Sequence, residues 1–431
     1  MAYLSLYLKK FACKFALLFV KSGRLKAELK AVKKELSLRR PYAPRLDGEK
    51  ISVLVIGTEG VGNSLYNHVR NIIRVNDYAK NSLHVYNGKE LYSYGSCRER
   101  TKEFAGDVYA LDASGFDVCV FCDPLRGGGN DAPLRYRLPH RRAARLYAYS
   151  VFDGTRLPRG WKELINETFD GVLVPCPNLM GIFRRSGVTK PVYELPVVID
   201  TEVYRDARPV KKETIRFGCV CSIEERKNVL KIVEAFDTCV ERFPDVEFVM
   251  HARYAYNDSD YVRRCVRAME RRRPRVTVTR GVKTDEEIVA LMKSFDVYVN
   301  CSTGEGYSVM PREALACGEA LILSDIATHR DIFQGQVEPG CLMVPAETEI
   351  PAFQASLNEV CGVNYDCAEE DIVKSVEILR ENRDALIYDD DAIRRRKRLA
   401  ERYGVAAVAE KFNALAERLA AGDAAQRREV S

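Results

Sequence analysis

The sequence predicts an α/β protein with two doubly wound domains, each a parallel sheet covered by helices on both faces. The chain has 431 residues, enough for two or three domains of ordinary size. From residue 51 onward, apolar runs rich in β-branched residues alternate with helical runs, which is typical of parallel strands buried on both faces. A polar stretch at 204–213 divides these runs into two sets. We therefore expect two domains that face each other across a cleft.

The strands of each set follow from the apolar runs. The first set is expected at 51–57, 83–88, 118–123, 146–152, 171–176 and 192–200, and the second at 215–222, 246–252, 276–281, 297–302, 319–325 and 341–346. Helical runs are expected at 353–361, 368–380 and 391–421, the last with an apolar stripe. The predicted division is a basic helical extension at 1–48, a first domain at 49–205, a second domain at 206–395 and a C-terminal helix at 396–431 that crosses back to the first domain.

Composition excludes several classes of protein. Apolar residues make up 46% and charged residues 30%, which excludes a disordered chain and a bundle of membrane helices. The fourteen cysteines have neither a disulfide framework nor zinc-ligand spacing, so free thiols in a reducing cytoplasm are expected. This excludes a secreted disulfide-bonded protein, and we expect no metal site.

The first fifty residues carry an excess of positive charge. They hold thirteen Lys or Arg against four Asp or Glu, a net charge of +9, so the rest of the chain sums to −3. On a helix, Lys9, Lys10, Lys14 and Lys21 fall within one arc and apolar residues fill the remainder. Such a helix suits an anionic membrane surface, here the inner membrane face, with residues 1–24 as the contact. Two alternatives stay open: docking on the protein's own core or on a second subunit, and a removed targeting sequence.

Three strand exits carry features of a binding site, because open parallel sheets bind ligands at the carboxyl ends of their strands. After strand 51–57, Gly60 and Gly62 allow a tight turn at a helix start, although the spacing is not that of the dinucleotide fingerprint. After strand 215–222, Arg226 and Lys227 open an amphipathic helix. Two cations at a helix start suit a diphosphate. The alternative for the first exit is a turn that serves only packing, and the alternative for the second is a solvated helix start.

The third exit, NCSTGEGYSVMPREALACGEALILSD, is the most specific. A strand ends at Ser302, a glycine-flanked loop presents Glu305, and a helix that starts near Ser308 carries Glu313. Both glutamates can therefore face one cleft. Between them, the amides of Gly306, Tyr307 and Ser308 can reach phosphate oxygens.

Taken together, residues 215–333 resemble the donor-binding domain of retaining GT-B glycosyltransferases of family 4, whose signature is two glutamates separated by seven residues. The matching stretches are EGYSVMPREALACG, FGCVCSIEERKN and RGVKTDEEIVALMKSFDVYVNCS. The first domain resembles the family more loosely, and the whole resemblance covers roughly residues 51–345. It implies a GT-B architecture of two Rossmann-like domains with N-terminal amphipathic helices added here.

The resemblance also implies roles for the candidate residues. Arg226 and Lys227 would bind the donor diphosphate, Glu305 would contact the transferred sugar, and Glu313 would hold the ribose. Many relatives carry a second arginine where Ser222 stands, so Arg226 would substitute for it. Many also carry a histidine at a first-domain strand exit, where this chain has CDPLRGGG, and Asp123 is the candidate there, with a turn-capping role as the alternative. The remaining donor-side candidates are Gly60, Gly62, Gly306, Tyr307, Ser308 and Val282.

The resulting expectation is a retaining, metal-independent hexosyltransferase that moves a sugar from a GDP- or UDP-sugar to a glycan or lipid-linked acceptor in polysaccharide synthesis. The nucleotide sugar is a substrate, and no cofactor is expected. One alternative is a catalytically silent GT-B subunit or scaffold for an active partner. A nicotinamide-dependent enzyme is disfavoured because the first turn lacks the dinucleotide spacing.

Two arginine clusters complete the candidates. The stretch 135–145 is expected to meet an anionic acceptor or a lipid phosphate, or to be solvated. The stretch 263–275 is expected to be a solvated helix face. Neither cluster has aromatic residues alternating with its arginines, so we expect no nucleic-acid partner.

Overall fold

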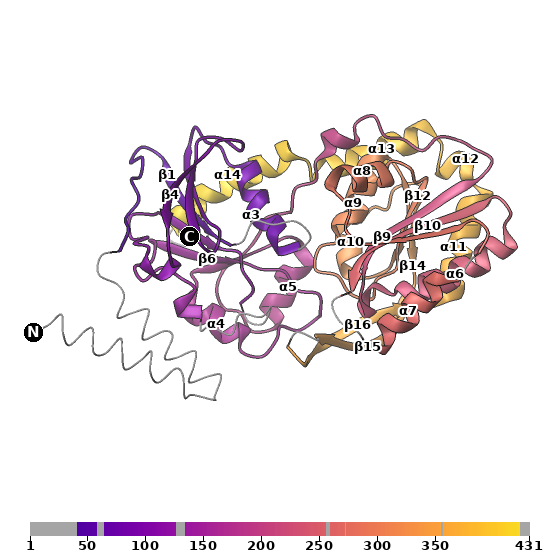
Figure 1. Cartoon of the computed structure of the whole chain (residues 1–431), viewed down its shortest axis with the longest axis horizontal. Coiled ribbons are helices and arrows are strands. Elements are labelled where there is room, and N and C mark those ends of the chain that lie inside the picture. Colours follow the sequence, from indigo (N-terminus) through magenta and orange to yellow (C-terminus); the bar gives the residue numbers. More distant parts are fainter. Residues whose placement is uncertain are drawn as a thin grey trace, which may run out of the picture.

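The computed structural model of the chain describes residues 41–57, 64–125, 134–255, 259–271, 273–354 and 357–422. It shows two α/β lobes side by side (Figure 1), which confirms the predicted fold class. The predicted N-terminal amphipathic helix at 4–21, Gly60 and Gly62 lie outside the described residues.

The first lobe is built on an eight-stranded sheet with the order β4-β3-β2-β1-β5-β6-β7-β8. β3 and β4 are antiparallel additions at one edge, absent from the predicted strands, and the others pair in parallel. The strands are β1 Ile51–Ile56, β2 Asn81–Tyr86, β3 Glu90–Tyr94, β4 Arg100–Ala105, β5 Val118–Phe121, β6 Arg145–Tyr149, β7 Gly171–Val174 and β8 Val192–Glu194. Its helices are α3 Ser64–Val75, α4 Trp161–Thr168 and α5 Pro177–Arg185, with short 3-10 turns at Val108–Ala110 and Leu134–Tyr136.

The second lobe has a six-stranded, fully parallel sheet with the order β11-β10-β9-β12-β13-β14. Its strands are nearly continuous apolar runs because helices cover both faces. The strands are β9 Ile215–Ile223, β10 Val246–Ala255, β11 Val276–Arg280, β12 Val297–Asn300, β13 Ala320–Ser324 and β14 Cys341–Val344. The helices are α6 Val229–Arg242, α7 Asp260–Glu270, α8 Asp285–Met292, α9 Val309–Cys317, α10 Ala327–Phe333, α11 Glu369–Glu381, α12 Arg383–Leu386 and α13 Asp390–Glu401, with 3-10 turns at Thr201–Tyr204 and Glu225–Lys227.

The predicted helix at 353–361 is wrong, because this region is a β-hairpin. β15 (Ala346–Gln354) pairs antiparallel with β16 (Glu359–Cys367). β16 reads EVCGVNYDC and contacts a loop of the first lobe, which no local periodicity reveals. The Val363 amide donates to Thr155 Oγ1 at 2.9 Å, and the Arg156 amide donates to the Cys361 carbonyl at 3.2 Å. The hairpin, at the lower edge of Figure 1, therefore bridges the lobes.

The predicted helix at 391–421 is two helices, with a break at 402–404. α13 packs on α9 of the second lobe, and α14 (Val405–Ala421) packs on α3 of the first. The predicted boundary at 395/396 therefore falls inside α13. The Ile199 amide donates to the Tyr403 carbonyl at 2.7 Å, so the two chain crossings between the lobes lie side by side.

Two further features bear on the predictions. Every cysteine that the structure describes is free. No helix within the described ranges is both long and apolar enough to cross a bilayer.

Candidate active site

A cleft of about 430 Å³ lies between the lobes, at the carboxyl ends of strands from both sheets. The second lobe lines it through the end of β9, the 3-10 turn at Glu225–Lys227, the loop after β12 and the start of α9. The first lobe lines it through α3, the loop after β6 and the segment after β8. The cleft is where topology places ligands in facing parallel sheets.

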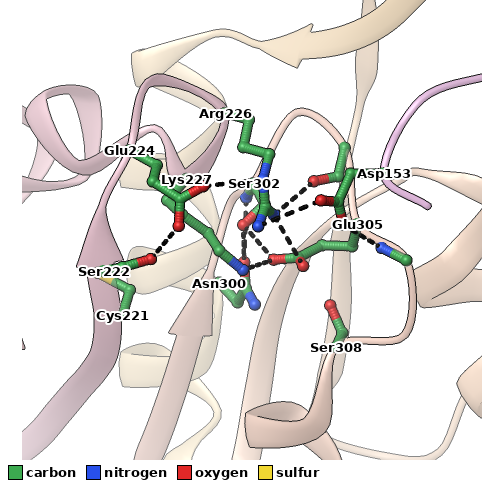
Figure 2. Close-up of polar contacts among 12 residues, drawn as sticks. Asp153, Cys221, Ser222, Glu224, Arg226, Lys227, Asn300, Ser302, Glu305 and Ser308 are labelled. Atoms are coloured by element: carbon green, nitrogen blue, oxygen red, sulfur yellow. Dashed lines mark hydrogen bonds and ion pairs between the residues drawn. The ribbon is translucent and has the colours of Figure 1, made fainter. Parts of the chain in front are cut away.

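Glu305 is the centre of the polar network at one end of this cleft (Figure 2), with a side chain only 5% exposed. Lys227 Nζ donates to its Oε1 at 2.5 Å, and Arg226 Nη1 donates to its Oε2 at 3.1 Å. Ser302 Oγ also donates to Oε1, at 2.7 Å. The two cations and the carboxylate, separated by nearly eighty residues in sequence, thus form one cluster.

Arg226 is surrounded by carboxylates. Besides Glu305, its guanidinium lies 3.4 Å from an oxygen of Asp153 and 3.3 Å from one of Glu224. It also donates to the Gly304 carbonyl at 3.2 Å. Burial opposes the charge on Arg226, but these acids outweigh it and raise its pKa. Arg226 is therefore a permanent cation.

Opposing effects act on the ionisation of Glu305. Burial favours its neutral form, but the charges of Lys227 and Arg226 outweigh that effect and hold its pKa well below the ordinary 4.5. Glu305 is therefore ionised at any physiological pH. Asp153 differs, because burial raises its pKa more than Arg226 lowers it.

The loop between β12 and α9 is fixed by unusual contacts. Ser308 has a left-handed backbone (φ 60°), and its Oγ lies 2.9 Å from His329 Nε2. The Arg312 guanidinium, on α9, donates to the Ser308 carbonyl at 3.0 Å and lies over the rings of Tyr307 and Tyr403, 3.8 and 4.6 Å from their centroids. The Tyr307 hydroxyl donates to the Val197 carbonyl of the first lobe at 2.9 Å. These contacts hold the loop against both lobes.

Glu313 lines the same cleft, eight residues after Glu305, in a different environment. Desolvation raises its pKa to about 7, which nearby Arg253 and a hydrogen bond with Tyr204 only partly offset. The predicted pair of glutamates therefore shares one cleft but not one charge state.

The structure does not bring every predicted site residue to the cleft. Asp123 follows β5 and lies 3.9 Å from the Arg137 guanidinium, outside the cleft lining. Val282 is 85% exposed and also lies outside it. Ser222 does line the cleft, and its hydroxyl donates to Glu224.

Asp153 is the residue that sequence reasoning missed. It follows β6, the neighbour of β5, and accepts a hydrogen bond from the Gly306 amide at 2.8 Å. This is one of the amides predicted to reach a phosphate. The sequence signal was an aspartate after a strand in VFDG, the same kind of signal that selected Asp123.

The first arginine cluster is largely paired with acids. Arg141 lies 3.1 Å from Asp112, and Arg142 lies 2.7 Å from Asp170. In the second cluster, Arg263, Arg264 and Arg267 are exposed on α7, as expected for a solvated face. Beyond α7, which ends at Glu270, the prediction is wrong for two arginines: Arg273 forms an ion pair with Asp237, and Arg275 Nε donates to the Val246 carbonyl at 3.1 Å. Within the described ranges, no group of three or more His, Cys, Asp or Glu side chains is placed to hold a metal ion.

Comparisons with known proteins bear on the family and the fold. Residues 214–361 match the profile of the family Glycosyl transferases group 1, a stretch that runs from the start of β9 into β16. No curated protein matches the chain.

Solved structures similar to the whole chain share its fold at low identity. The pneumococcal O-GlcNAc transferase GtfA, in complex with UDP and GlcNAc, has 12% identity and a TM-score of 0.53, over 78% of this chain and 66% of that one. Anabaena HepE, with UDP and glucose, has 12% identity and a TM-score of 0.57, over 85% and 99%. Sucrose-phosphate synthase from Thermosynechococcus elongatus has 13% identity and a TM-score of 0.58, over 86% and 100%. The chain thus spans just under two thirds of GtfA. The fold is GT-B. Together, this fold and the family match within the second lobe support the interpretation that the protein is a glycosyltransferase.

Proposed function

We propose that the protein is a retaining, metal-independent glycosyltransferase of the family-4 type, which moves a hexose from a nucleotide sugar to a glycan or lipid-linked acceptor. The observation that carries the proposal is the convergence of Arg226, Lys227 and Glu305 at one end of a cleft whose lining also includes Glu313. UDP in the structures of GtfA and HepE favours a UDP-sugar as donor.

In the proposed reaction, the bond between the sugar's anomeric carbon and the β-phosphate oxygen breaks, and the acceptor oxygen bonds to that carbon on the same face. The acceptor's proton passes to an oxygen of the departing diphosphate. Lys227 and Arg226 stabilise the charge that develops on that diphosphate. Such stabilisation by preorganised charges is usually the largest single contribution to catalysis. Glu305 holds both cations and contacts the sugar. Glu313 accepts hydrogen bonds from the ribose.

The alternative of a silent subunit or scaffold has one observation in its favour. Asp153 already occupies the Gly306 amide and contacts Arg226, two of the groups proposed to bind the diphosphate. A silent protein could keep that contact permanently, whereas an enzyme must release it when the donor binds.

A panel of nucleotide sugars separates the two. We expect one UDP-sugar to raise the melting temperature, because a ligand that binds the folded state stabilises it. The same sugar should then be slowly hydrolysed by the purified protein after chelator treatment. Binding without any turnover, with every acceptor tested, would favour the scaffold. Turnover lost to chelator and restored by Mn²⁺ or Mg²⁺ would contradict metal independence.

We also propose that residues 1–24 attach the protein to an anionic inner leaflet. Their lysines would each contribute about 1 kcal/mol near such a surface, and salt would screen that attraction. Removal of residues 1–24 should abolish sedimentation with anionic vesicles and spare donor binding. If the truncation unfolds the protein or splits an oligomer instead, the segment docks on protein.

A further inference from the structure

A second cavity lies in the first lobe, outside the cleft. It is a groove of about 730 Å³ between α5, the edge strand β8 and α14. None of its lining residues is shared with the cleft. Its size is within the range of pockets that hold small molecules.

The floor of the groove is apolar. Val188, Val192 and Leu415 form it with nearly buried side chains, and Met180 adds a half-buried thioether. Apolar surface of this kind favours an alkyl chain, which leaves water on binding.

The rim of the groove is cationic. Arg184, Lys190, Lys411 and Arg418 line it, and three of them are exposed. The acid in the lining is Glu194, which lies 3.7 Å from Lys411. Among the described residues, no carboxylate lies within ion-pair distance of Arg184, Lys190 or Arg418. Three cations thus remain without an acidic partner around an apolar floor.

We propose that this groove binds an amphipathic phosphate, a lipid with a phosphate head at the cationic rim and an alkyl chain on the apolar floor. Arginine and lysine are the usual partners of phosphate, and charge-assisted hydrogen bonds to it are strong. A peptide strand added to β8 fits less well, because β8 has only three residues, Val192–Glu194, and offers few backbone groups for pairing. The inference concerns a site distinct from the donor cleft and does not depend on the proposed reaction.

Binding of monododecyl phosphate below its micellar concentration tests the proposal. Calorimetry on the full-length protein should show saturable binding, at least about tenfold tighter than dodecyl maltoside, because the maltoside lacks the charge. Inorganic phosphate should bind far more weakly than either, since it lacks the chain. Equal affinity for the phosphate and the maltoside, or no binding of the phosphate, would overturn the proposal.

A pair of variants locates the site. Lys190→Glu with Arg418→Glu should weaken monododecyl phosphate binding at least about tenfold, because two attractive charges become repulsive. Arg264→Glu with Arg267→Glu makes the same charge change on α7 and should leave binding within about twofold, because ionic screening limits the reach of distant surface charges. The melting temperature of both pairs should stay close to that of the wild type, which shows that they are folded. If both pairs weaken binding equally, the effect is one of net charge and the groove is not the site.

A floor variant provides an independent check. Met180→Gln keeps all four cations and removes apolar contact, so it should weaken monododecyl phosphate while leaving inorganic phosphate unchanged. An unchanged affinity for the alkyl phosphate in this variant would also contradict the proposal.

Discussion

Two parts of the cleft, around Glu305 and around Glu313 and called here the Glu305 end and the Glu313 end, hold the same side chain in opposite electrostatic environments. Glu305 is buried with Lys227 at 2.5 Å and Arg226 at 3.1 Å, and its pKa is strongly depressed. Glu313 lies eight residues later, where desolvation dominates and raises its pKa to about 7. Burial alone therefore does not determine ionisation in this cleft, since paired cations decide it.

The difference has a functional meaning under the proposed reaction. At the Glu305 end, charge is fixed in advance and does not respond to pH, as suits groups that face a leaving diphosphate. At the Glu313 end, ionisation changes near neutrality, so ribose binding should depend on pH. Substitutions around each glutamate test this contrast, and the largest effect is expected at Lys227.

Lys227→Ala should disrupt the charge cluster around Glu305. We expect sugar transfer or donor hydrolysis to fall at least about 10²-fold, the scale of losing one preorganised stabiliser of developing charge. The free energy of unfolding should also fall by about 3–5 kcal/mol, because Glu305 is left as a buried charge with less compensation. Steady-state rates and chemical denaturation measure the two effects.

Lys231→Ala is the matched control, one turn further along the chain in α6. Its ammonium lies 2.5 Å from Asp366 and outside the cleft lining. Its turnover should remain within a few-fold of the wild-type value. Comparable losses in both variants would show that Lys227 acts through stability alone.

Glu313→Gln should remove the carboxylate whose ionisation changes near neutral pH. Nucleotide binding should weaken by about 1–3 kcal/mol, the scale of a hydrogen bond to a charged group. In the wild type, affinity should rise as pH rises through about 7, because the ionised carboxylate is the better acceptor. The same group should lower the free energy of unfolding as pH rises from about 4.5 to about 7, with the loss levelling off above 7, because the folded state holds the proton more tightly than the unfolded chain does. Calorimetry between pH 6 and 8 should find a flat affinity in the variant, and a slope equal to that of the wild type would contradict the assignment.

Asp153→Asn should make the surroundings of Glu305 and Arg226 more positive. The amide keeps a hydrogen-bond acceptor for the Gly306 N–H but removes a negative charge 3.4 Å from Arg226. UDP affinity should therefore rise about threefold to tenfold, the effect of one screened charge in a partly solvated site. A weaker affinity would instead mean that Asp153 helps to shape the donor site.

Arg253→Met should produce the smallest change. Arg253 is the cation that lowers the pKa of Glu313 against desolvation, so its loss should move the pH midpoint of UDP binding upward, by less than about one pH unit. A downward movement would show that Arg253 does not act on Glu313 as a charge.

The second-lobe side of this site could be predicted because its signals are local. Strand, glycine-flanked loop and helix follow one another within EGYSVMPREALACG, so Glu305 and Glu313 were identified before any tertiary contact was known. Arg226 and Lys227 were identifiable at a separate strand exit, but their contact with Glu305 is tertiary.

The first-lobe side could not be predicted in the same way. Asp123 and Asp153 both follow apolar strands, and only the tertiary structure shows that the exit after β6 faces Gly306. The hairpin at 346–367 was mistaken for a helix over part of its length because its pairing and its contact with Thr155 are long-range. Acids that pair with the first arginine cluster come from distant segments, which charge counting along the sequence does not reveal.

The two chain crossings between the lobes meet at the hydrogen bond from Ile199 to Tyr403, so a relative rotation of the lobes would have its axis near this point. Rotation about such an axis moves nearby atoms little and distant atoms most. The β15–β16 hairpin is at the opposite edge of the interface from these crossings (Figure 1), so it has the longest lever arm. Any opening that admits a donor would therefore be largest at the contacts of Thr155 and Arg156 with the hairpin, where a pair of fluorophores or spin labels would report it most sensitively.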